Sequence, residues 1–223
     1  PFGTDWLGRN MFHRTLTGLS MSILIGVLAA GVSAVMALIL GICAATLGKK
    51  VDSAISFAID TVMGIPHILL LILISYAMGK GLKGVIAGVA LTHWTSLARL
   101  IRGEVMQLRE SEYIQIAGKL GLGKWEIAKK HIVPHVLPQF IVGLVLLFPH
   151  AILHESSITF LGFGLSTEQP AIGVILSESM RYLIMGKWWL AVFPGMMLVL
   201  TVVLFEKGGT ALRQLLDPGS VHK

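Results

Sequence analysis

Charged side chains are scarce in this sequence. Asp, Glu, Lys and Arg make up 13% of its 223 residues, whereas 54% are hydrophobic; a soluble domain averages about 25% charged residues. This shortage excludes a soluble enzyme, a disordered tail and a nucleic-acid-binding domain. A net charge of +6 suits nucleic acid only if the basic residues form one patch, so their placement along the chain decides what they mean.

Cysteine is almost absent. Cys43 is the one cysteine and lies in an apolar stretch, so neither an intrachain disulfide nor a cysteine-ligated zinc or iron–sulfur site is possible. The position favours a small buried hydrophobic residue. The first ten residues lack the pattern of a signal peptide. The chain begins at Pro1 rather than at methionine, from which we expect a further segment upstream.

Long uncharged runs are abundant. A membrane helix needs about 20 mostly apolar residues. Four stretches meet this need, Thr15–Gly48, Thr61–Gly79, His131–His154 and Trp188–Phe205, and a fifth, Gly84–Ala98, is short but is extended by Leu82 and by Leu100–Ile101. The sequence therefore predicts an all-α polytopic membrane protein with five transmembrane helices in this chain, forming a single domain over residues 1–223.

The basic residues orient these spans. With five spans, 12 of the 18 Lys and Arg residues fall on the side that holds residues 99–130 and the C-terminus. Because basic loops stay in the cytoplasm, this side is predicted to be cytoplasmic and Pro1 to lie outside. The positive charge is thus an orientation signal and not a footprint of nucleic acid.

The loop between the third and fourth spans, residues 99–138, is long and patterned. Apolar residues recur at helical spacing on one face: Tyr113, Ile116, Ala117 and Leu120. Three glycines then predict a turn, Gly118, Gly121 and Gly123, and a second short helix follows over Lys124–His131, stopped by Pro134. Such a helical pair can dock on another protein or rest on lipid headgroups, and the pattern leaves both open.

Four segments of the chain carry a family resemblance. Gln115-Ile116-Ala117, Gly121 and His131-Ile132-Val133-Pro134 have the spacing of the EAA loop of ABC importer permeases, E-A-A-x3-G-x9-I-x-L-P, with substitutions at four of its positions. The segments Phe2–Asn10, Phe160–Leu165 and Leu212–Pro218 resemble F-G-T-D-x-x-G-R-D, S-F-L-G-L-G and L-R-x-x-L-D-P of the peptide/nickel branch. The resemblance spans essentially the whole chain, and it implies a sixth span before Pro1.

The resemblance implies a type I ABC importer permease in a bacterial or archaeal cytoplasmic membrane. Such a subunit is not an enzyme and holds no cofactor, because ATP and Mg²⁺ bind to separate subunits. The implied partners are a homologous second permease subunit, two ATP-binding subunits, an extracytoplasmic substrate-binding protein and the lipid bilayer. Nucleic acid is not among them.

The same resemblance assigns the coupling to the ATP-binding subunits to seven residues: Glu112, Tyr113, Ala117, Leu120, Gly121, Leu122 and Trp125. Gly121 either allows close approach to the partner or caps its own helix. Glu112 either pairs with basic groups of the partner or caps its helix. Trp125 is either an anchor in the partner's groove or a ring at the headgroup level.

Two enzyme motifs fail on inspection. Residues 118–124 satisfy G-x-x-x-x-G-K, but Trp125 stands where Mg²⁺ binding needs Ser or Thr, and no strand precedes the match. His154-Glu155 begins H-E-x-x-H, but Ile158 replaces the second His. Neither nucleotide hydrolysis nor proteolysis is predicted for this chain.

The histidines of the sequence give evidence on which substrate is transported. His150 and His154 are four residues apart in the fourth span, with Glu155 next to them. Ionisable groups in a span are costly and usually functional, imidazole suits Ni²⁺, Cu²⁺ and Zn²⁺, and the pair resembles an H-x-x-x-H of nickel permeases. These three residues are the predicted metal or substrate path, with His67 and His93 as weaker candidates.

The alternatives on cargo stay open. The histidines can instead make structural hydrogen bonds, and Pro149 can disturb the helix that carries them. The main hypothesis is import of nickel or a nickel chelate, and the alternative is a dipeptide or oligopeptide, whose ends Glu155, Glu178 and Arg181 can bind. A channel or structural subunit that works without ATP is the rival from another class.

The outer loop Glu168–Lys187 also has apolar residues at helical spacing, among them Ile172, Ile175 and Leu176. The pattern predicts a helix or re-entrant segment at the mouth of the pore, which receives the binding protein by resemblance, or a plain interfacial helix.

Overall fold

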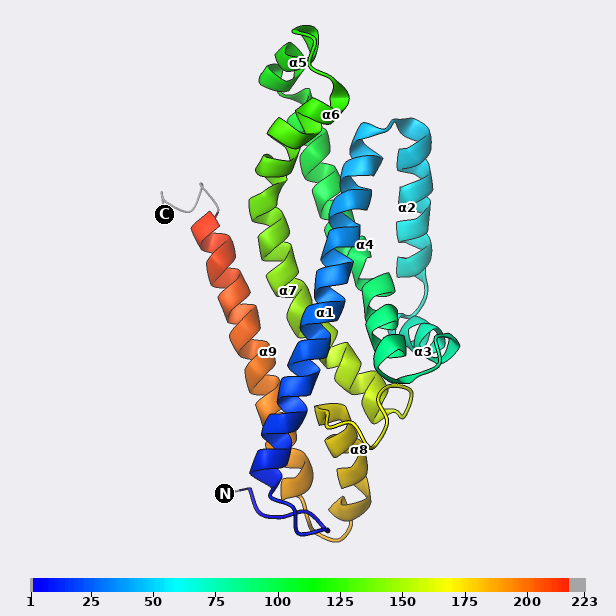
Figure 1. Ribbon diagram of the computed structural model, residues 1–223, viewed down its shortest axis with the longest axis vertical. Coiled ribbons are helices and arrows are strands. Elements are labelled where there is room, and N and C mark those ends of the chain that lie inside the picture. The colour runs from blue at the N-terminus through cyan, green and yellow to red at the C-terminus, as the bar shows by residue number, and fades with distance from the viewer. Residues whose placement is uncertain (1, 217–223) are drawn as a thin grey trace.

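The computed structural model describes residues 2–216, and within that range the regular structure is helical. Its elements are α1 (Met11–Thr46), α2 (Lys49–Gly64), α3 (His67–Ala77), α4 (Gly81–Glu110), α5 (Glu112–Lys119), α6 (Lys124–Ile127), the π-helical turn η1 (Ala128–Ile132), α7 (Val133–Phe160), α8 (Ile172–Leu183) and α9 (Trp189–Leu216). The long helices α1, α4, α7 and α9 run along the long axis of the molecule (Figure 1). The predicted all-α fold is confirmed.

Four helical stretches are long and apolar enough to cross a membrane: α1, α4, residues 125–160, which include α7, and α9. They match the first, third, fourth and fifth predicted spans. The second predicted span, Thr61–Gly79, is not one helix. It runs across a break where α2 and α3 meet at a bend of 100°, so a fifth span exists only if this bent pair is counted as one.

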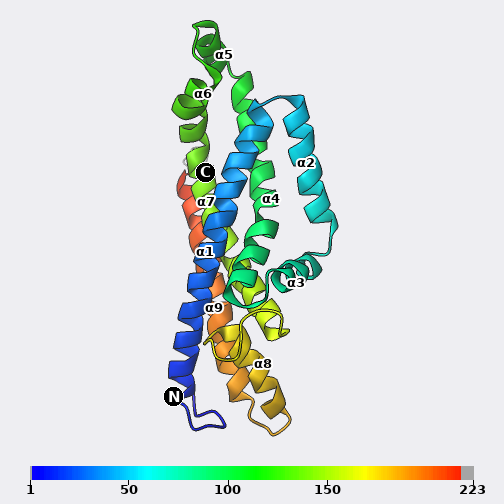
Figure 2. The same cartoon turned by 45° about the vertical axis from the view of Figure 1, so that its right-hand side comes forward.

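Proline explains the break. Residues that precede proline are pushed out of the helical region, and Ile65, just before Pro66, has φ −90° and ψ 137°. The helix therefore ends at Gly64 and restarts at His67. The 11 residues of α3 are too few to cross a bilayer, and α3 instead lies across the foot of α2 (Figure 2).

The predicted stop at Pro134 is wrong. The helix that begins at α6 passes through η1 into α7, with Pro134 in the first turn of α7. A proline removes one backbone donor and crowds the carbonyl four residues earlier. The wider π-helical turn directly before it, Ala128–Ile132, separates these groups, so the chain continues as a helix.

The helices of the bundle approach closely where small residues meet. A side-chain carbon at Gly41 of α1 would lie 2.8 Å from the Ala98 carbonyl oxygen of α4. Apolar helices in lipid gain little from hydrophobic burial and associate through such close packing. One turn further along α4, α2 is tied to α4 by the Asp52–Arg102 ion pair, whose second contact is 2.7 Å.

The Phe160–Leu165 segment, one of the family-like motifs, is a structural joint. The Phe163 carbonyl accepts a hydrogen bond of 2.8 Å from Ser75 Oγ in α3, and the Gly164 carbonyl accepts one of 3.0 Å from the Gly81 amide in α4. The motif therefore fixes the end of α7 to the α3–α4 turn. The C-terminal motif ends α9, and its Asp217 and Pro218 lie outside the described residues.

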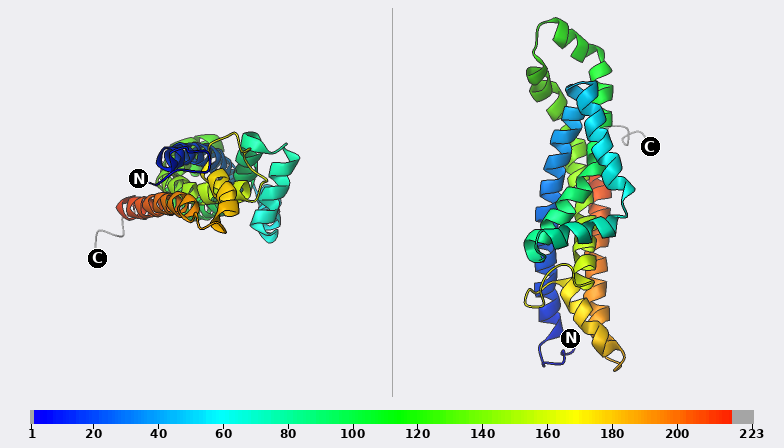
Figure 3. Two further views of the ribbon diagram at one scale, coloured as in Figure 1. Left: turned by 90° about the horizontal axis from the view of Figure 1, so that it is seen from below. Right: turned by 90° about the vertical axis from the view of Figure 1, so that its right-hand side faces the viewer.

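The bundle has two different ends. At one end, α4 and α7 rise beyond α1 and α2 and are joined there by α5 and α6 (Figure 3). At the opposite end lie the N-terminal segment, α8 and the start of α9 (Figure 1). We call residues 111–132 the tip, and residues 2–14 together with α8 and the start of α9 the outer end.

Candidate functional site

The tip has one covered and one uncovered apolar face. Ile114 and Ala117 of α5 are buried, and Ile114 belongs to a buried apolar cluster with residues of α4 and η1. Leu120 and Trp125 are 76% and 82% exposed, and Tyr113 and Ile116 are also exposed. Of the apolar stripe in the sequence, Ala117 alone is buried, because α5 turns its Ile114–Ala117 edge toward the bundle.

Gly121 ends α5 by a tight reversal. Its φ of +92° lies in the left-handed region, where a Cβ is unfavourable. The Gly121 amide donates to the Gly118 carbonyl at 3.1 Å and the Leu122 amide donates to the Ala117 carbonyl at 3.2 Å, which satisfies carbonyls at the helix end. The structure thus shows the helix-capping role, while close approach to a partner stays a prediction.

Glu112 lies in the first turn of α5. A carboxylate there interacts favourably with the unpaired amides and the dipole of the helix N-terminus. No side-chain hydrogen bond caps this helix from Ser111, so Glu112 supplies the negative charge at that end. Pairing with basic groups on a partner stays a prediction.

A cavity of about 660 Å³ opens beside the break between α2 and α3. The break, α4 and α7 form its walls. Its polar lining consists of four histidines and three hydroxyl groups, His67, His93, His150, His154, Thr92, Thr95 and Ser96. No carboxylate belongs to the lining, so a ligand in this cavity meets ring nitrogens and hydroxyls.

Three of these histidines meet, and we call His67, His93 and His154 the histidine cluster. Their potential ligand nitrogens all lie within 4.8 Å of one another, and the ring centroids are 4.5 to 5.0 Å apart. The two weaker candidates from the sequence therefore join one residue of the predicted pair. His150 lines the same cavity but is outside the cluster.

Glu155 does not face this cavity. It is fully buried and accepts hydrogen bonds of 3.1 Å from Thr159 Oγ1 and 3.2 Å from Ser156 Oγ. Adjacent residues of a helix point about 100° apart, which separates Glu155 from His154. The structure thus brings His154 and His150 to the cavity and places Glu155 in the packing of α7.

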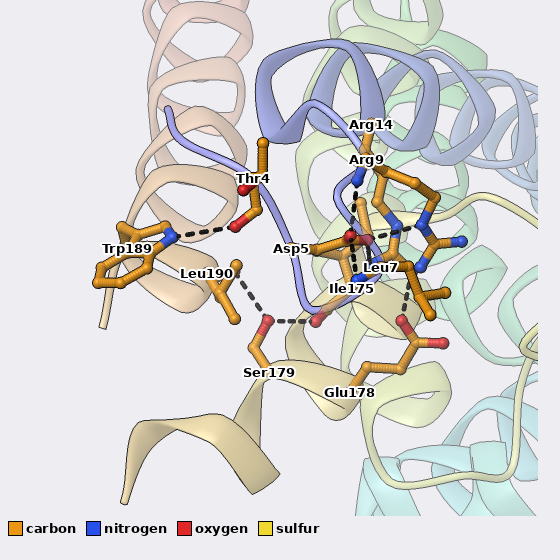
Figure 4. Close-up of polar contacts among 10 residues, drawn as sticks. All are labelled: Thr4, Asp5, Leu7, Arg9, Arg14, Ile175, Glu178, Ser179, Trp189 and Leu190. Atoms are coloured by element: carbon orange, nitrogen blue, oxygen red, sulfur yellow. Dashed lines mark hydrogen bonds and ion pairs between the residues drawn. The ribbon is translucent and has the colours of Figure 1, made fainter. Parts of the chain in front are cut away.

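The outer end contains an ion-pair network that sequence reasoning missed (Figure 4). Asp5 is buried and accepts 2.9 Å hydrogen bonds from the amides of Leu7 and Arg9 and one of 2.6 Å from Arg9 Nε. Arg14 bridges Asp5, at 3.3 Å, to Glu178 of α8. The network ties the segment before α1 to α8.

The electrostatics of Asp5 follow from these contacts. Burial alone raises the pKa of a carboxyl, but the hydrogen bonds and charge of Arg9 and the Leu7 amide outweigh it and hold the pKa of Asp5 below its ordinary value of 3.8. Asp5 is therefore charged at neutral pH. The F-G-T-D segment could have suggested a turn, but only the fold shows Arg14 and Glu178 beside it.

Aromatic stacking reinforces the outer end. Trp6 stacks on Tyr182 with centroids 4.4 Å apart, and Phe2 stacks on Phe193 at 4.2 Å. The predicted helix in the outer loop is confirmed as α8, whose Ile172, Ile175 and Ser179 are buried. Contacts within the chain thus hold the N-terminal segment, α8 and the start of α9 together at the outer end.

Comparison with known sequences gives a consistent result. Residues 37–220 match the family model described as binding-protein-dependent transport system inner membrane component. The dipeptide transport system permease protein DppC of Bacillus subtilis is 34% identical over 97% of this chain and 68% of its own length. The oligopeptide transport system permease protein OppC of the same organism is also 34% identical, over 97% of this chain and 71% of its own length. The probable D,D-dipeptide transport system permease protein DdpC of Escherichia coli is 31% identical, over 97% of this chain and 72% of its own length.

Solved structures agree on the fold. The MetNI methionine ABC transporter in an inward-facing conformation aligns with a TM-score of 0.76 at 15% identity, covering 93% of this chain and 98% of the other. An amino acid ABC transporter solved with histidines aligns with a TM-score of 0.66 at 18% identity, covering 91% and 94%. At these identities the likeness establishes the arrangement of helices alone.

Proposed function

Because the chain belongs to the family of binding-protein-dependent transport system inner membrane components, we propose that it moves dipeptides or oligopeptides across the cytoplasmic membrane. Membership makes the chain a multi-pass permease subunit of an ABC importer of the type I fold, and not itself an enzyme. The cargo, the partner contacts and the coupling route are the proposal.

One observation carries the peptide cargo. The relatives named above align with 97% of this chain, and their names assign them dipeptides, oligopeptides or D,D-dipeptides. They support the peptide alternative over nickel as the transported species. The hydroxyl and imidazole groups of the 660 Å³ cavity are suited to hydrogen bonding with a peptide backbone.

The tip supports a route for coupling to ATP. Its exposed Leu120 and Trp125 offer apolar anchors of the kind that dominate protein interfaces, and the Gly121 turn holds them in one shape. In this proposal ATP and Mg²⁺ bind to two partner subunits on the cytoplasmic side, and Tyr113–Leu122 transmits their closure to α4 and α7.

The remaining partners follow from the same proposal. A homologous second permease subunit packs beside this chain and closes the cavity that is open at the α2–α3 break. An extracytoplasmic binding protein delivers the peptide at the outer end, next to α8. Closure by a partner explains why a cavity lined by polar groups lies at the edge of a single subunit.

Uptake in cells that produce the whole transporter tests the cargo. A radiolabelled dipeptide and radiolabelled Ni²⁺ are supplied in parallel, with a matched strain whose ATP-binding subunits carry an inactivated hydrolysis site. We expect saturable dipeptide uptake that is lost in the matched strain. Dipeptide uptake that persists without hydrolysis would support the ATP-independent channel, and Ni²⁺ uptake without dipeptide uptake would overturn the peptide cargo.

A further inference from the structure

The histidine cluster is assembled by tertiary structure from three helices. His67 begins α3 directly after the proline break, His93 lies in α4, and His154 lies in α7. The residues are 26 and 61 positions apart in sequence, so no local motif brings them together. Three imidazoles converging inside a membrane-spanning bundle are expensive to bury without a purpose.

The ring nitrogens of the cluster are ready to act as ligands. The Nδ1 atom of His93 lies 3.0 Å from the Val89 carbonyl oxygen. A proton on Nδ1 satisfies this carbonyl and leaves the lone pair on Nε2. This is the arrangement by which proteins orient a metal-binding histidine, because the other ring nitrogen donates to a backbone carbonyl.

The Nε2 atoms of two histidines in the cluster have no hydrogen-bond partner. The Nε2 atoms of His93 and His67 are buried and make no hydrogen bond, and His93 is only 8% exposed. Buried polar atoms are nearly always paired. No hydrogen bond links the three rings among the described contacts, so a self-contained hydrogen-bonded network does not account for them.

The side chains that line the cavity favour one class of ligand. With no carboxylate in its lining, the cavity is a poor site for Ca²⁺ or Mg²⁺, which prefer oxygen ligands. Neutral imidazole is the preferred ligand of Ni²⁺, Cu²⁺ and Zn²⁺. A peptide backbone can use the hydroxyls, but it does not require three imidazoles at one point.

We propose that His67, His93 and His154 bind one divalent first-row transition metal ion of the Ni²⁺, Cu²⁺ or Zn²⁺ type. In tetrahedral geometry with bonds of 2.0–2.1 Å, ligand nitrogens are about 3.3 Å apart, so the rings close by up to about 1.5 Å on binding. His67 lies at the break, where a short movement of α3 accommodates this closure. The remaining coordination positions face the cavity.

The coordination positions that the three histidines leave open can be filled in two ways, which correspond to two sources of the metal. Either the bare ion binds and water completes its coordination, or a peptide that already chelates the metal supplies the remaining donors. Both sources use the same three imidazoles. The site rests on the residues of this chain and does not depend on the peptide cargo, so either proposal can fail without the other.

Metal retention by the intact importer tests the site. The complex is purified in lipid nanodiscs through a tag without histidine, incubated with Ni²⁺ alone or with Ni²⁺ and excess dipeptide, and separated from free metal before its nickel content is measured. We expect one retained Ni²⁺ per copy of this chain. Retention without dipeptide identifies the bare ion, and retention only with dipeptide identifies the chelate; no retention in either arm overturns the proposal.

Variants locate the metal. We expect His67→Ala, His93→Ala and His154→Ala each to weaken Ni²⁺ binding by at least about tenfold, by comparison with the loss known for orienting groups around metal sites. His13→Ala and His135→Ala, which lie outside the cavity, are the matched controls. Loss on His150→Ala with retention in His67→Ala would overturn the three-helix site in favour of one on α7.

A spectroscopic measurement on the unmodified protein covers the case in which a variant fails to assemble. Cu²⁺ bound to the native complex is expected to show electron paramagnetic resonance couplings from several imidazole nitrogens. A spectrum with oxygen ligands only would contradict the site. Dipeptide uptake measured on the same material reports separately on the proposed function.

Discussion

The two ends of this molecule differ in how their residues are held. At the outer end, the carboxylates of Asp5 and Glu178 pair with Arg9 and Arg14, and Trp6 stacks on Tyr182. At the tip, the exposed side chains of Leu120 and Trp125 take part in no ion pair or ring contact among the described residues. The outer end is tied together by polar and stacking contacts within the chain, and the tip presents apolar side chains without them.

The difference bears on the proposed coupling. At the outer end, Arg14 of α1 is paired with Glu178 of α8. The tip is joined to the bundle through Ile114 and η1, next to α4 and α7, which line the histidine cavity. In the proposed coupling, a movement of the tip passes to the helices that carry His93 and His154.

The largest effect is expected from making the tip polar. In the double variant Leu120→Asp/Trp125→Asp, two exposed apolar side chains become charged, so an apolar contact with an ATP-binding subunit is lost while the fold of the chain is not strained. We expect dipeptide uptake to fall at least about tenfold, since interface anchors of this kind are worth 2 kcal/mol or more.

The matched control is Lys129→Glu, which changes the charge of the tip by the same amount at an exposed position without removing an apolar side chain. It is expected to keep uptake near the native level at equal protein abundance. Normal uptake in the double variant would show that the uncovered face is not a docking surface.

The second largest effect is expected from substitutions of Asp5 at the outer end, and it concerns the stability of the fold rather than coupling. Asp5→Ala leaves Arg14 and two amides without their buried acceptor, which we expect to cost roughly 2–4 kcal/mol. Asp5→Asn keeps one oxygen to accept from the Leu7 and Arg9 amides but replaces the oxygen that accepts from Arg9 and Arg14 by an amide donor, so its loss is smaller than that of Asp5→Ala. Thermal unfolding in detergent measures both, and equal melting temperatures for Asp5→Ala and the native chain would contradict the network.

Acidification should remove the same stabilisation without mutation. The pKa of Asp5 is lower in the folded chain than its ordinary 3.8, so its charge stabilises the fold fully above about pH 3.8 and loses this effect as the pH falls through the lower folded value. The difference in melting temperature between the native chain and Asp5→Asn should be constant from pH 7 to pH 5 and shrink below pH 3.8. A difference that grows on acidification would have the wrong sign.

The smallest effect is expected at the turn of the tip. Gly121→Ala places a Cβ at φ +92°, which costs about 1–2 kcal/mol, although no atom lies within 4 Å to clash. We expect a few-fold loss of uptake. Gly123→Ala is the matched control, because Gly123 has neither a left-handed φ nor a close neighbour; equal loss in both would remove the special role of Gly121.

The sequence predicted the helical class and most spans because a long apolar run has few other structures available to it. It failed where a proline acts on its surroundings. Pro66 breaks a run that reads as one span, while Pro134 does not stop a helix, because the π-helical turn before it separates the groups that would clash. Pro66 itself is a signal for the first outcome, because the residue before a proline is biased away from the helix, whereas none of the spacing patterns applied to the sequence marks the π-helical turn.

The tip and the histidine cluster also differ in how far the sequence predicted them. Residues of the tip are contiguous, so spacing predicted an apolar face followed by a glycine turn, while the roles expected for Gly121 and Trp125 came from the family resemblance. The histidine cluster joins positions 67, 93 and 154, and the nearby pair His150 and His154 drew attention because it is close in sequence. Only the bend at Pro66 brings His67 to the other two, and no spacing rule contains that bend.

The most direct test of the account compares the two ends by photo-crosslinking in the assembled importer. A photoreactive phenylalanine derivative replaces Trp125 at the tip or, as the matched site, Trp188 at the outer end, which is 56% exposed. We predict crosslinks from position 125 to an ATP-binding subunit and none to that subunit from position 188. Crosslinks to the ATP-binding subunit from position 188, or their absence from position 125, would contradict this prediction.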